Sequence, residues 1–384
     1  MRYANLLLML ALTSPLVAQI QVIRGSSRAP EPAAAEEPAP EAAPAEEEAK
    51  PPADPRERRQ EERVVYQSGG QSRPAQSTVQ RSVDGDAKSL AQRVKSINGR
   101  TVPYLTEDER VVSTSQDLKV TERVRQRYDA TGRPAGQDSE RIEERKLPDG
   151  TIETTTTVYT ADLNGRMQPA ERRIVRTKET GGDTRTLTTT QTTSPNGDFR
   201  TIVEEESIER REGEQAGTVE TTTKTLQAGS GLQVTSREET VMRVENGVSV
   251  TETQTFERSP ATADLELAQR TVGKLTERPD GSSTETVETY GFDAGSGRNV
   301  NATRMELQSL QSSQTAVSAE GTVTEKISYK ERSAVNSREF EAETLTQKVS
   351  KPTADGESVR TDIYEKGVNG RMAPTESIIE KVEK

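Results

Sequence analysis

Turn glycines recur about every 34 residues through most of the chain, and each is followed by a run rich in Thr, Val and Glu. The runs after Gly150, Gly217 and Gly247 read TIETTTTVY, TVETTTKTL and VSVTETQTF. A large side chain closes each run eight or nine residues after its glycine: Tyr159, Leu226, Phe256, Tyr290, Tyr329 and Tyr364. An internal repeat constrains the fold before any single motif does, because each copy must be one small supersecondary unit.

A second turn follows the large side chain in most copies, as in LNGR at 163–166, PNGD at 195–198 and VNGR at 368–371. Asn-Gly favours the type I′ turn of a β-hairpin, and β-branched runs such as 154–157 favour strands over helices. Each unit is therefore predicted to be a β-hairpin. Eight units span 117–384, with boundaries after residues 150, 183, 217, 247, 281, 321 and 356, and 86–116 is predicted to be a degenerate first repeat.

The fold class that follows is all-β, with tandem antiparallel hairpins forming an elongated, twisted or rolled meander sheet. About sixteen strands would not stay in one flat sheet, since twist accumulates from strand to strand. The Lys/Glu-rich segment 376–384 is expected to be an exposed edge strand. The alternative is disorder in much of 117–384, because hydrophobic residues make up 30% and aromatic residues 3% of the chain.

The N-terminal part of the chain indicates export. Residues 1–18 resemble a signal peptide, with Arg2 before an apolar run at 6–12 and Ala18 at a cleavage position. An acidic Ala/Pro/Glu-rich linker, predicted to be disordered, occupies 19–85. Its RERRQEER cluster at 56–63 could be a short charged helix or part of that tail. We expect a periplasmic, cell-surface or extracellular protein.

Two residue types are missing from the sequence, and their absence limits the chemistry. Without His or Cys the chain has no imidazole or thiolate nucleophile system, no such metal ligand and no disulfide. A net charge of −11 disfavours a general nucleic-acid binder. No run is long enough for a membrane-spanning helix, and twelve aromatic residues are few for the girdles of a transmembrane barrel. We expect no enzyme, no cofactor, no nucleic-acid partner and no membrane span.

The segment YDATGR at 128–133 resembles the core motif of bacterial YD (RHS-type) repeats, and looser versions recur from Tyr159, Tyr290 and Tyr364. In that family tandem hairpins build long β-sheets that roll into a shell around a toxin. The match is in register at Tyr128, Asp129, Gly132 and Arg133, whereas the other copies carry extra residues. The resemblance implies tandem hairpins more than it implies encapsulation of a toxin.

Candidate sites are few. Turn aspartates could gather Ca²⁺ or could simply be solvated: Asp84, Asp86, Asp149, Asp162 and Asp280. The six large residues that close the runs could form a ladder that binds a ligand, or they could pack the sheet. Asn301-Ala302-Thr303 fits a glycosylation sequon.

The function expected from the sequence is a non-enzymatic structural, scaffold or interaction role at the bacterial cell envelope or outside the cell. The first alternative is a carbohydrate- or peptidoglycan-binding module that uses the strand aromatics. The second is a hydrolase that relies on carboxylates alone. The partner could be an envelope polymer or another protein.

Overall fold

The computed structural model describes residues 56–65, 75–95, 99–162, 165–194, 196–213, 216–292, 305–332, 340–353, 356–367 and 370–383. Two compact units divide the chain, Met1–Pro52 and Ala53–Lys384, and the described residues all belong to the second. The predicted signal peptide at 1–18, the linker as far as residue 55 and the sequon at 301–303 lie outside the described residues.

The described residues form strands joined by turns, which confirms the all-β antiparallel prediction. The twenty strands are β1 Arg56–Val65, β2 Ala75–Asp84, β3 Ala87–Lys95, β4 Thr101–Thr114, β5 Leu118–Tyr128, β6 Pro134–Lys146, β7 Ile152–Ala161, β8 Met167–Thr180, β9 Asp183–Thr193, β10 Phe199–Arg211, β11 Gly217–Gln227, β12 Gly231–Glu245, β13 Val248–Arg258, β14 Leu265–Glu277, β15 Ser283–Gly291, β16 Glu306–Val317, β17 Val323–Arg332, β18 Phe340–Thr353, β19 Gly356–Lys366 and β20 Met372–Glu383. No helix in this part of the chain is long and apolar enough to cross a membrane.

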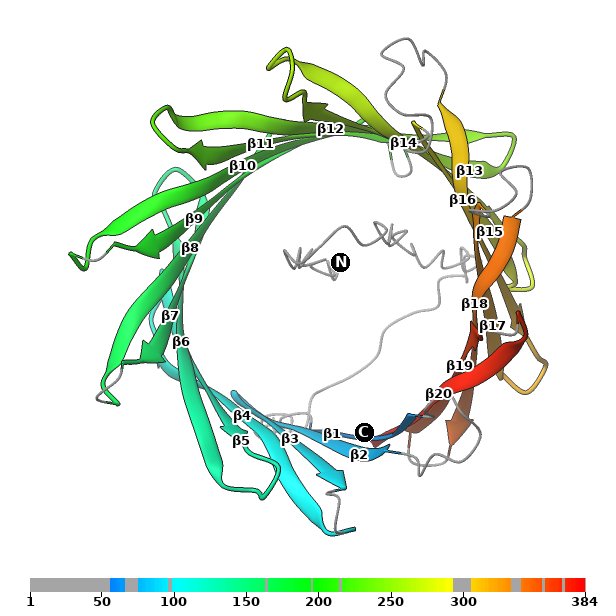
Figure 1. Ribbon diagram of the computed structural model, residues 1–384, viewed down its shortest axis with the longest axis horizontal. Coiled ribbons are helices and arrows are strands. Elements are labelled where there is room, and N and C mark those ends of the chain that lie inside the picture. Colours follow the sequence, from blue (N-terminus) through cyan, green and yellow to red (C-terminus); the bar gives the residue numbers. More distant parts are fainter. Residues whose placement is uncertain are drawn as a thin grey trace, which may run out of the picture. The chain divides into compact units, whose positions relative to one another are not determined.

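Each strand pairs with its neighbours in the sequence, and the first strand pairs with the last. The β1–β20 ladder runs from Arg58 opposite Glu383 to Val65 opposite Glu376, so the sheet closes into a barrel (Figure 1). The antiparallel meander was predicted correctly, but the elongated, twisted or rolled sheet was wrong, because the sheet closes on itself. The segment 376–384 was predicted to be an edge strand, whereas β20 has a paired strand on each side, β19 and β1. Closure of the barrel removes both free edges of the sheet.

The first two strands lie within the segment that the sequence analysis assigned to a disordered linker. β1 holds the whole RERRQEER cluster, and β2 follows it as an antiparallel partner. Residues 56–63 are therefore neither a short helix nor part of a tail. The strands escaped the prediction because the sequence of β1 has no alternation of polar and apolar residues, and because one of its two partners, β20, comes from the other end of the sequence.

Four of the predicted unit boundaries, after residues 150, 247, 281 and 321, fall in turns, whereas those after 183, 217 and 356 fall at the first residue of a strand. The turns also differ in length. Asn246 and Gly247 both have positive φ, as a two-residue type I′ turn requires. At 162–166 the turn has five residues instead, with Asp162 N–H donating to the Arg166 carbonyl at 2.9 Å and Gly165 N–H donating to the Asp162 carbonyl at 2.9 Å. In such a turn a single glycine at the fourth position supplies the left-handed residue.

The barrel wall is one sheet thick and has little core. Among the described residues four apolar side chains are buried, namely Val79, Val120, Val250 and Val382, and no side chain is less than 2% exposed. Buried Thr and Ser side chains, such as Thr157 and Ser313, lie in the same wall. The backbone ladder and cross-strand side-chain pairs therefore supply most of the stabilising contacts.

Two rims differ in the length of their turns. The connections from even to odd strands have two to five residues and form the short-turn rim, where β1 begins and β20 ends. The connections from odd to even strands have three to fourteen residues and form the long-turn rim. Nine of the hairpins at the long-turn rim carry a bulge, as at Val158/Tyr159, Thr255/Phe256 and Ile363/Tyr364. Bulges increase local twist and are common at the rims of barrels.

Replacing Gly217 by Ala is expected to destabilise the barrel by about 1–3 kcal/mol, the usual cost of overpacking. A Cβ placed on Gly217 would lie 2.5 Å from the carbonyl oxygen of Arg210, and this is a backbone atom that cannot turn away. Gly273 is the matched control, because it lies on the same face of the sheet and its Cβ would meet nothing closer than 3.8 Å. Urea unfolding followed by circular dichroism measures both variants, and equal losses would contradict the packing argument.

Candidate functional site: the two faces of the barrel wall

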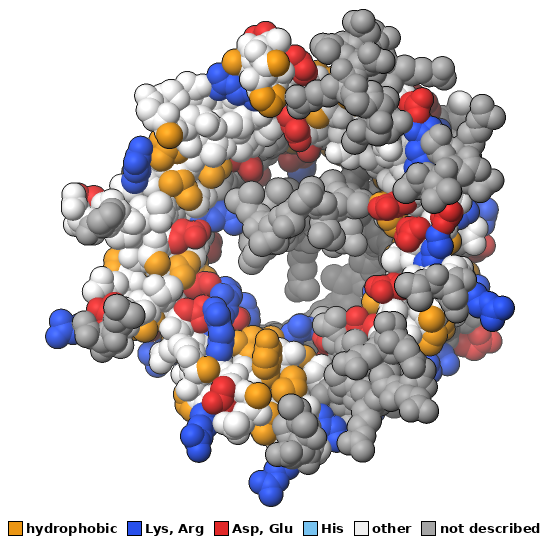
Figure 2. Space-filling view, viewed as in Figure 1, with side chains coloured by type: hydrophobic (Ala, Val, Ile, Leu, Met, Phe, Trp, Pro, Cys, Tyr) orange, Lys and Arg blue, Asp and Glu red, His pale blue; other side chains and the backbone are white. Residues whose placement is uncertain are grey.

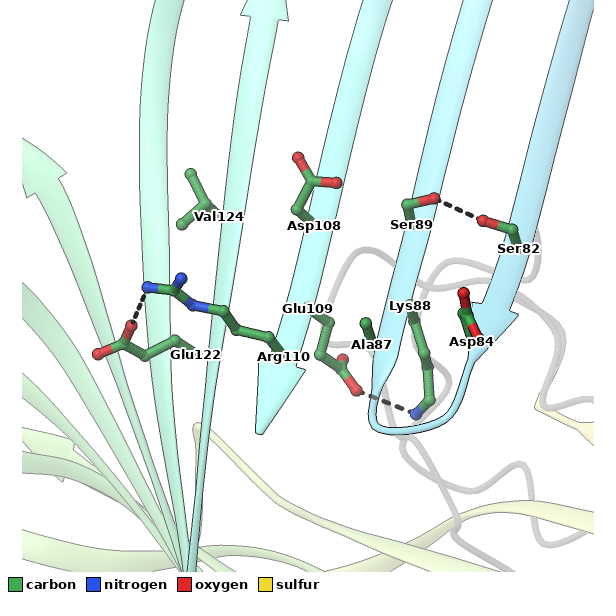
Figure 3. Close-up of a pocket in the computed structure, with 10 residues that line it drawn as sticks. All are labelled: Ser82, Asp84, Ala87, Lys88, Ser89, Asp108, Glu109, Arg110, Glu122 and Val124. Carbon is green, nitrogen blue, oxygen red and sulfur yellow. Dashed lines mark hydrogen bonds and ion pairs between the residues drawn. The ribbon is translucent and has the colours of Figure 1, made fainter. Parts of the chain in front are cut away.

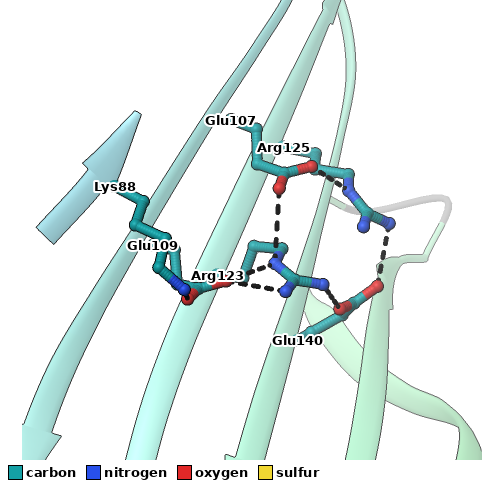
Figure 4. A network of polar contacts seen from close by, with 6 residues as sticks. All are labelled: Lys88, Glu107, Glu109, Arg123, Arg125 and Glu140. Atoms are coloured by element: carbon teal, nitrogen blue, oxygen red, sulfur yellow. Dashed lines mark hydrogen bonds and ion pairs between the residues drawn. The ribbon is translucent and has the colours of Figure 1, made fainter. Parts of the chain in front are cut away.

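Side chains alternate between two faces along every strand, and the pairing register carries each face from one strand to the next. One face includes Ser82, Ser89, Asp108 and Val124 (Figure 3), and the other includes Glu109, Arg123 and Glu140 (Figure 4). In Figure 3 other strands of the barrel cross behind the labelled residues, so that view is from outside. Figure 4 looks at the same region from the lumen. The first set therefore lies on the outer face, and the second lies on the lumen face.

An ion-pair network occupies the lumen face of β3–β6. The Arg123 guanidinium lies 2.6 Å from a Glu109 oxygen, 2.8 Å from Glu140 and 3.3 Å from Glu107. Arg125 joins Glu107 at 2.6 Å and Glu140 at 2.8 Å. Arg123 is 19% exposed and the three carboxylates are 13–25% exposed, so water screens these pairs less than it screens pairs on an open surface.

The carboxylate of Glu109 shows how the network couples stability to pH. Burial acts to raise the pKa of Glu109, but hydrogen bonds from Lys88 and Arg123 outweigh it and hold the pKa below its ordinary value. A carboxylate whose pKa is lowered by folding stabilises the folded state above its unfolded pKa. That contribution is lost as the pH falls through the lower, folded value.

We expect Glu109→Gln to lower the free energy of unfolding at pH 7 by about 1.5–3 kcal/mol, because the amide removes charge-assisted hydrogen bonds. The difference from the unmodified protein should shrink as the pH falls below the ordinary pKa of a glutamate and through the lower pKa of folded Glu109, because protonation then removes the same charge. Urea titrations at several pH values measure it. A difference that stays constant as the pH falls would show that shape, and not charge, explains the loss.

The wall formed by β14–β20 separates charge between its two faces. Between the bulges and the short-turn rim its lumen face carries six glutamates and one lysine: Glu277, Glu285, Glu325, Glu357, Glu376, Glu380 and Lys348. Over the same stretch the outer-face side chains that the structure describes include six cations and two acids: Arg270, Lys274, Lys326, Lys351, Arg360, Lys381, Glu288 and Asp362. The lumen side is thus acidic where the outer side is basic.

The outer face carries charge around the rest of the ring as well. Ion pairs on this face include Arg110 with Glu122, Arg176 with Glu153, and Arg270 with Glu252. Figure 2, which looks along the barrel axis, shows charged side chains among the polar and apolar ones around the rim in view. A charged side chain facing the middle of a bilayer costs about 2–4 kcal/mol, so this pattern is unlike a lipid-facing surface.

The six large residues that close the sequence runs are all half-buried, and they do not share one face. Tyr159, Leu226, Phe256, Tyr290 and Tyr364 lie on the outer face near the long-turn rim, and each has an apolar cross-strand partner, such as Pro169 opposite Tyr159. Tyr329 lies on the lumen face, because the register of β17 places it opposite Gln311 of β16. There its hydroxyl donates to Glu331 at 2.7 Å, and burial together with this carboxylate raises the pKa of Tyr329 to about 12.

Cation–π contacts on the outer face were missed by the sequence analysis. The Arg172 guanidinium lies 3.9 Å from the centre of the Phe199 ring, and the Arg237 guanidinium lies 5.0 Å from that of Phe256. Arg172 and Phe199 are separated by 27 positions in the sequence, and their side chains meet across β9, which pairs with β8 on one side and with β10 on the other. Predicting these pairs requires the register of strand pairing, and the sequence around each residue does not specify that register.

The turn aspartates act within their own turns. The Asp149 carboxylate accepts hydrogen bonds from Thr151 and Lys178, and these hold the pKa of Asp149 at about 2. Asp280 accepts from Ser282, and Asp162 accepts from the Arg166 N–H. Asp84 is the last residue of β2, and Asp86 forms a two-residue turn with Gly85. Among the described residues no group of three or more acidic side chains is arranged to hold a metal ion.

Comparisons with known proteins give no family. No protein-family model matches the chain, and no curated protein matches it in sequence. The resemblance to YD repeats therefore stays a prediction. Among solved structures it is similar to three from Pseudomonas aeruginosa: OpdQ (7% identity, 85% of this chain and 95% of that chain covered, TM-score 0.41), OccK9, also called OpdG (11%, 85% and 97%, 0.45), and OccK2, also called OpdF, in complex with glucuronate (11%, 85% and 97%, 0.43). Similarities this low carry no argument about what this chain does.

Proposed function

We propose that this is an exported, non-enzymatic barrel with an interaction role at the cell envelope or outside the cell, and that its lumen receives a cationic guest. The observation that carries this is the lumen face of β14–β20, where six glutamates accompany one lysine. Carboxylates that line an enclosed surface of one sign attract counter-ions more strongly than the same groups would on an open surface. Ser and Thr side chains between them, such as Ser309 and Ser313, offer further acceptors.

The experiment uses nonaarginine as the cationic probe and isothermal calorimetry at low ionic strength. The variant Glu277→Gln/Glu325→Gln/Glu357→Gln is expected to bind it about tenfold more weakly or worse, since three acceptor charges leave the lumen. The control Glu122→Gln/Glu206→Gln/Glu288→Gln makes the same change in net charge on the outer face, and should change affinity less than about twofold. Equal effects in both variants would show attraction to net charge only, and would contradict a lumen site.

A membrane channel is the second candidate. The even number of strands, and the position of both the start of β1 and the end of β20 at the short-turn rim, are typical of bacterial outer-membrane barrels. The charged outer face argues against it. Addition of the protein to planar lipid bilayers is expected to give no conductance steps, and regular steps would establish the channel in place of a guest-binding barrel.

A further inference from the structure

The outer face of β14–β20 holds four exposed lysines that have no ion-pair partner among the described residues: Lys274, Lys326, Lys351 and Lys381. Elsewhere on the outer face most cations face a carboxylate, as Arg176 faces Glu153 and Lys224 faces Glu204. The described residues therefore give these four lysines no carboxylate within ion-pair distance. We call them the lysine patch.

Many of the residues between the lysines are small and polar, although Gln347 and Val349 lie between Lys326 and Lys351. Thr286 and Ser312 continue the row from Lys274 across two strands, and Ser358 lies directly between Lys351 and Lys381. From strand spacing of about 4.8 Å and a rise of about 3.3 Å per residue, neighbouring lysines of the patch lie roughly 10–16 Å apart. The patch is thus an extended surface of hydroxyl groups with a cation at each of several separated points.

We propose that the lysine patch binds a linear anionic polysaccharide, one whose sugars carry carboxylate or sulfate groups. Charge complementarity selects a polyanion, and the hydroxyl groups between the lysines match the hydroxyl groups of a sugar chain as hydrogen-bond partners. A nucleic acid fits less well, because single strands need aromatic stacking and the outer-face aromatics lie near the opposite rim. A lipid surface fits less well because the patch offers few apolar side chains for insertion.

The location of the patch is independent of the guest proposed for the lumen. The lysines lie on the outer face, whereas the glutamates of β14–β20 face the lumen. Loss of binding at one face therefore leaves the other testable in the same protein. A lumen that fails to bind nonaarginine would not affect the polysaccharide proposal, and the reverse also holds.

The test measures heparin binding by the full-length protein, with dextran as the uncharged polysaccharide. The variant Lys274→Gln/Lys326→Gln/Lys351→Gln/Lys381→Gln is expected to lose at least about tenfold in affinity. The matched control is Arg93→Gln/Arg100→Gln/Arg145→Gln/Arg166→Gln, which removes four exposed cations outside the patch and should change affinity less than about twofold. Circular dichroism verifies that both variants stay folded.

Four results would overturn the proposal. They are the absence of heparin binding, equal losses in the two variants, equal affinity for dextran, and tighter binding to duplex DNA or to vesicles of anionic phospholipid than to heparin. The supporting result is heparin binding that weakens as salt concentration rises and that depends on the lysine patch and not on the control positions.

Discussion

Removal of residues 1–65 is expected to prevent the barrel from closing as an antiparallel ring. The deletion takes away β1, which makes ten residue pairs with β2 and eight with β20. Both β2 and β20 run antiparallel to β1, so after its removal the two strands that face the gap are parallel to each other. The register and bulges of the remaining strands are built for antiparallel ladders, and a parallel ladder is slightly weaker per residue.

The matched variant removes more of the chain and is nevertheless expected to form a closed, monomeric barrel. Deletion of residues 1–84 takes away β1 and β2 together, and the strands left at the gap, β3 and β20, are again antiparallel. Eighteen strands can then close, whereas nineteen leave two free edges that pair with other molecules. Size-exclusion chromatography with light scattering should show oligomers or aggregates for the shorter deletion and a monomer for the longer one. A stable monomer from the shorter deletion would contradict this parity argument.

Replacing Arg123 by Ala is expected to lower the free energy of unfolding by about 3 kcal/mol. This guanidinium contacts Glu107, Glu109 and Glu140, which come from the two strands on either side of its own. Its loss leaves three half-buried carboxylates with Arg125 and Lys88 as the cations near them. Leaving charge without its partner in a poorly hydrated place is more costly than losing the attraction itself.

Two further variants separate the network from charge in general. Arg123→Lys keeps the charge but not the planar fork that contacts several carboxylates together, so it should recover only part of the stability. Arg110→Ala removes an arginine that is 74% exposed and meets Glu122 at 3.4 Å, and should cost less than about 0.5 kcal/mol. Thermal and urea unfolding measure all three. A similar loss for Arg110→Ala and Arg123→Ala would show that the network gives no special stability.

The repeat made the hairpins predictable. Turn glycines such as Gly150 and Gly281 lie between two strands, because the left-handed conformation that they supply belongs to the turn itself, whereas Gly217 begins β11. The sequence also contains the long Thr-rich runs that favour strands, as in β7 and β9. These are local properties, and they require no knowledge of which strands are partners.

Closure could not be predicted in this way. It depends on the β1–β20 pairing, which joins residues more than 300 positions apart through two strands rich in charged side chains. The same limit applies to the site. The separation of charge in β14–β20 follows from alternation once the register is known. Spacing alone does not supply that register, because Tyr329 and Tyr364 each follow a turn glycine by eight residues and lie on opposite faces. Local composition does not fix that register.

The thinness of the wall has a thermodynamic consequence. The heat-capacity change of unfolding comes mainly from apolar surface that becomes hydrated, and here four apolar side chains are buried among the described residues. The heat-capacity change per residue should therefore fall below the usual value of about 12–15 cal/mol/K. A small heat-capacity change flattens the dependence of stability on temperature. This barrel should then hold a nearly constant stability over a wide range of temperature, with cold denaturation displaced far below the freezing point of water.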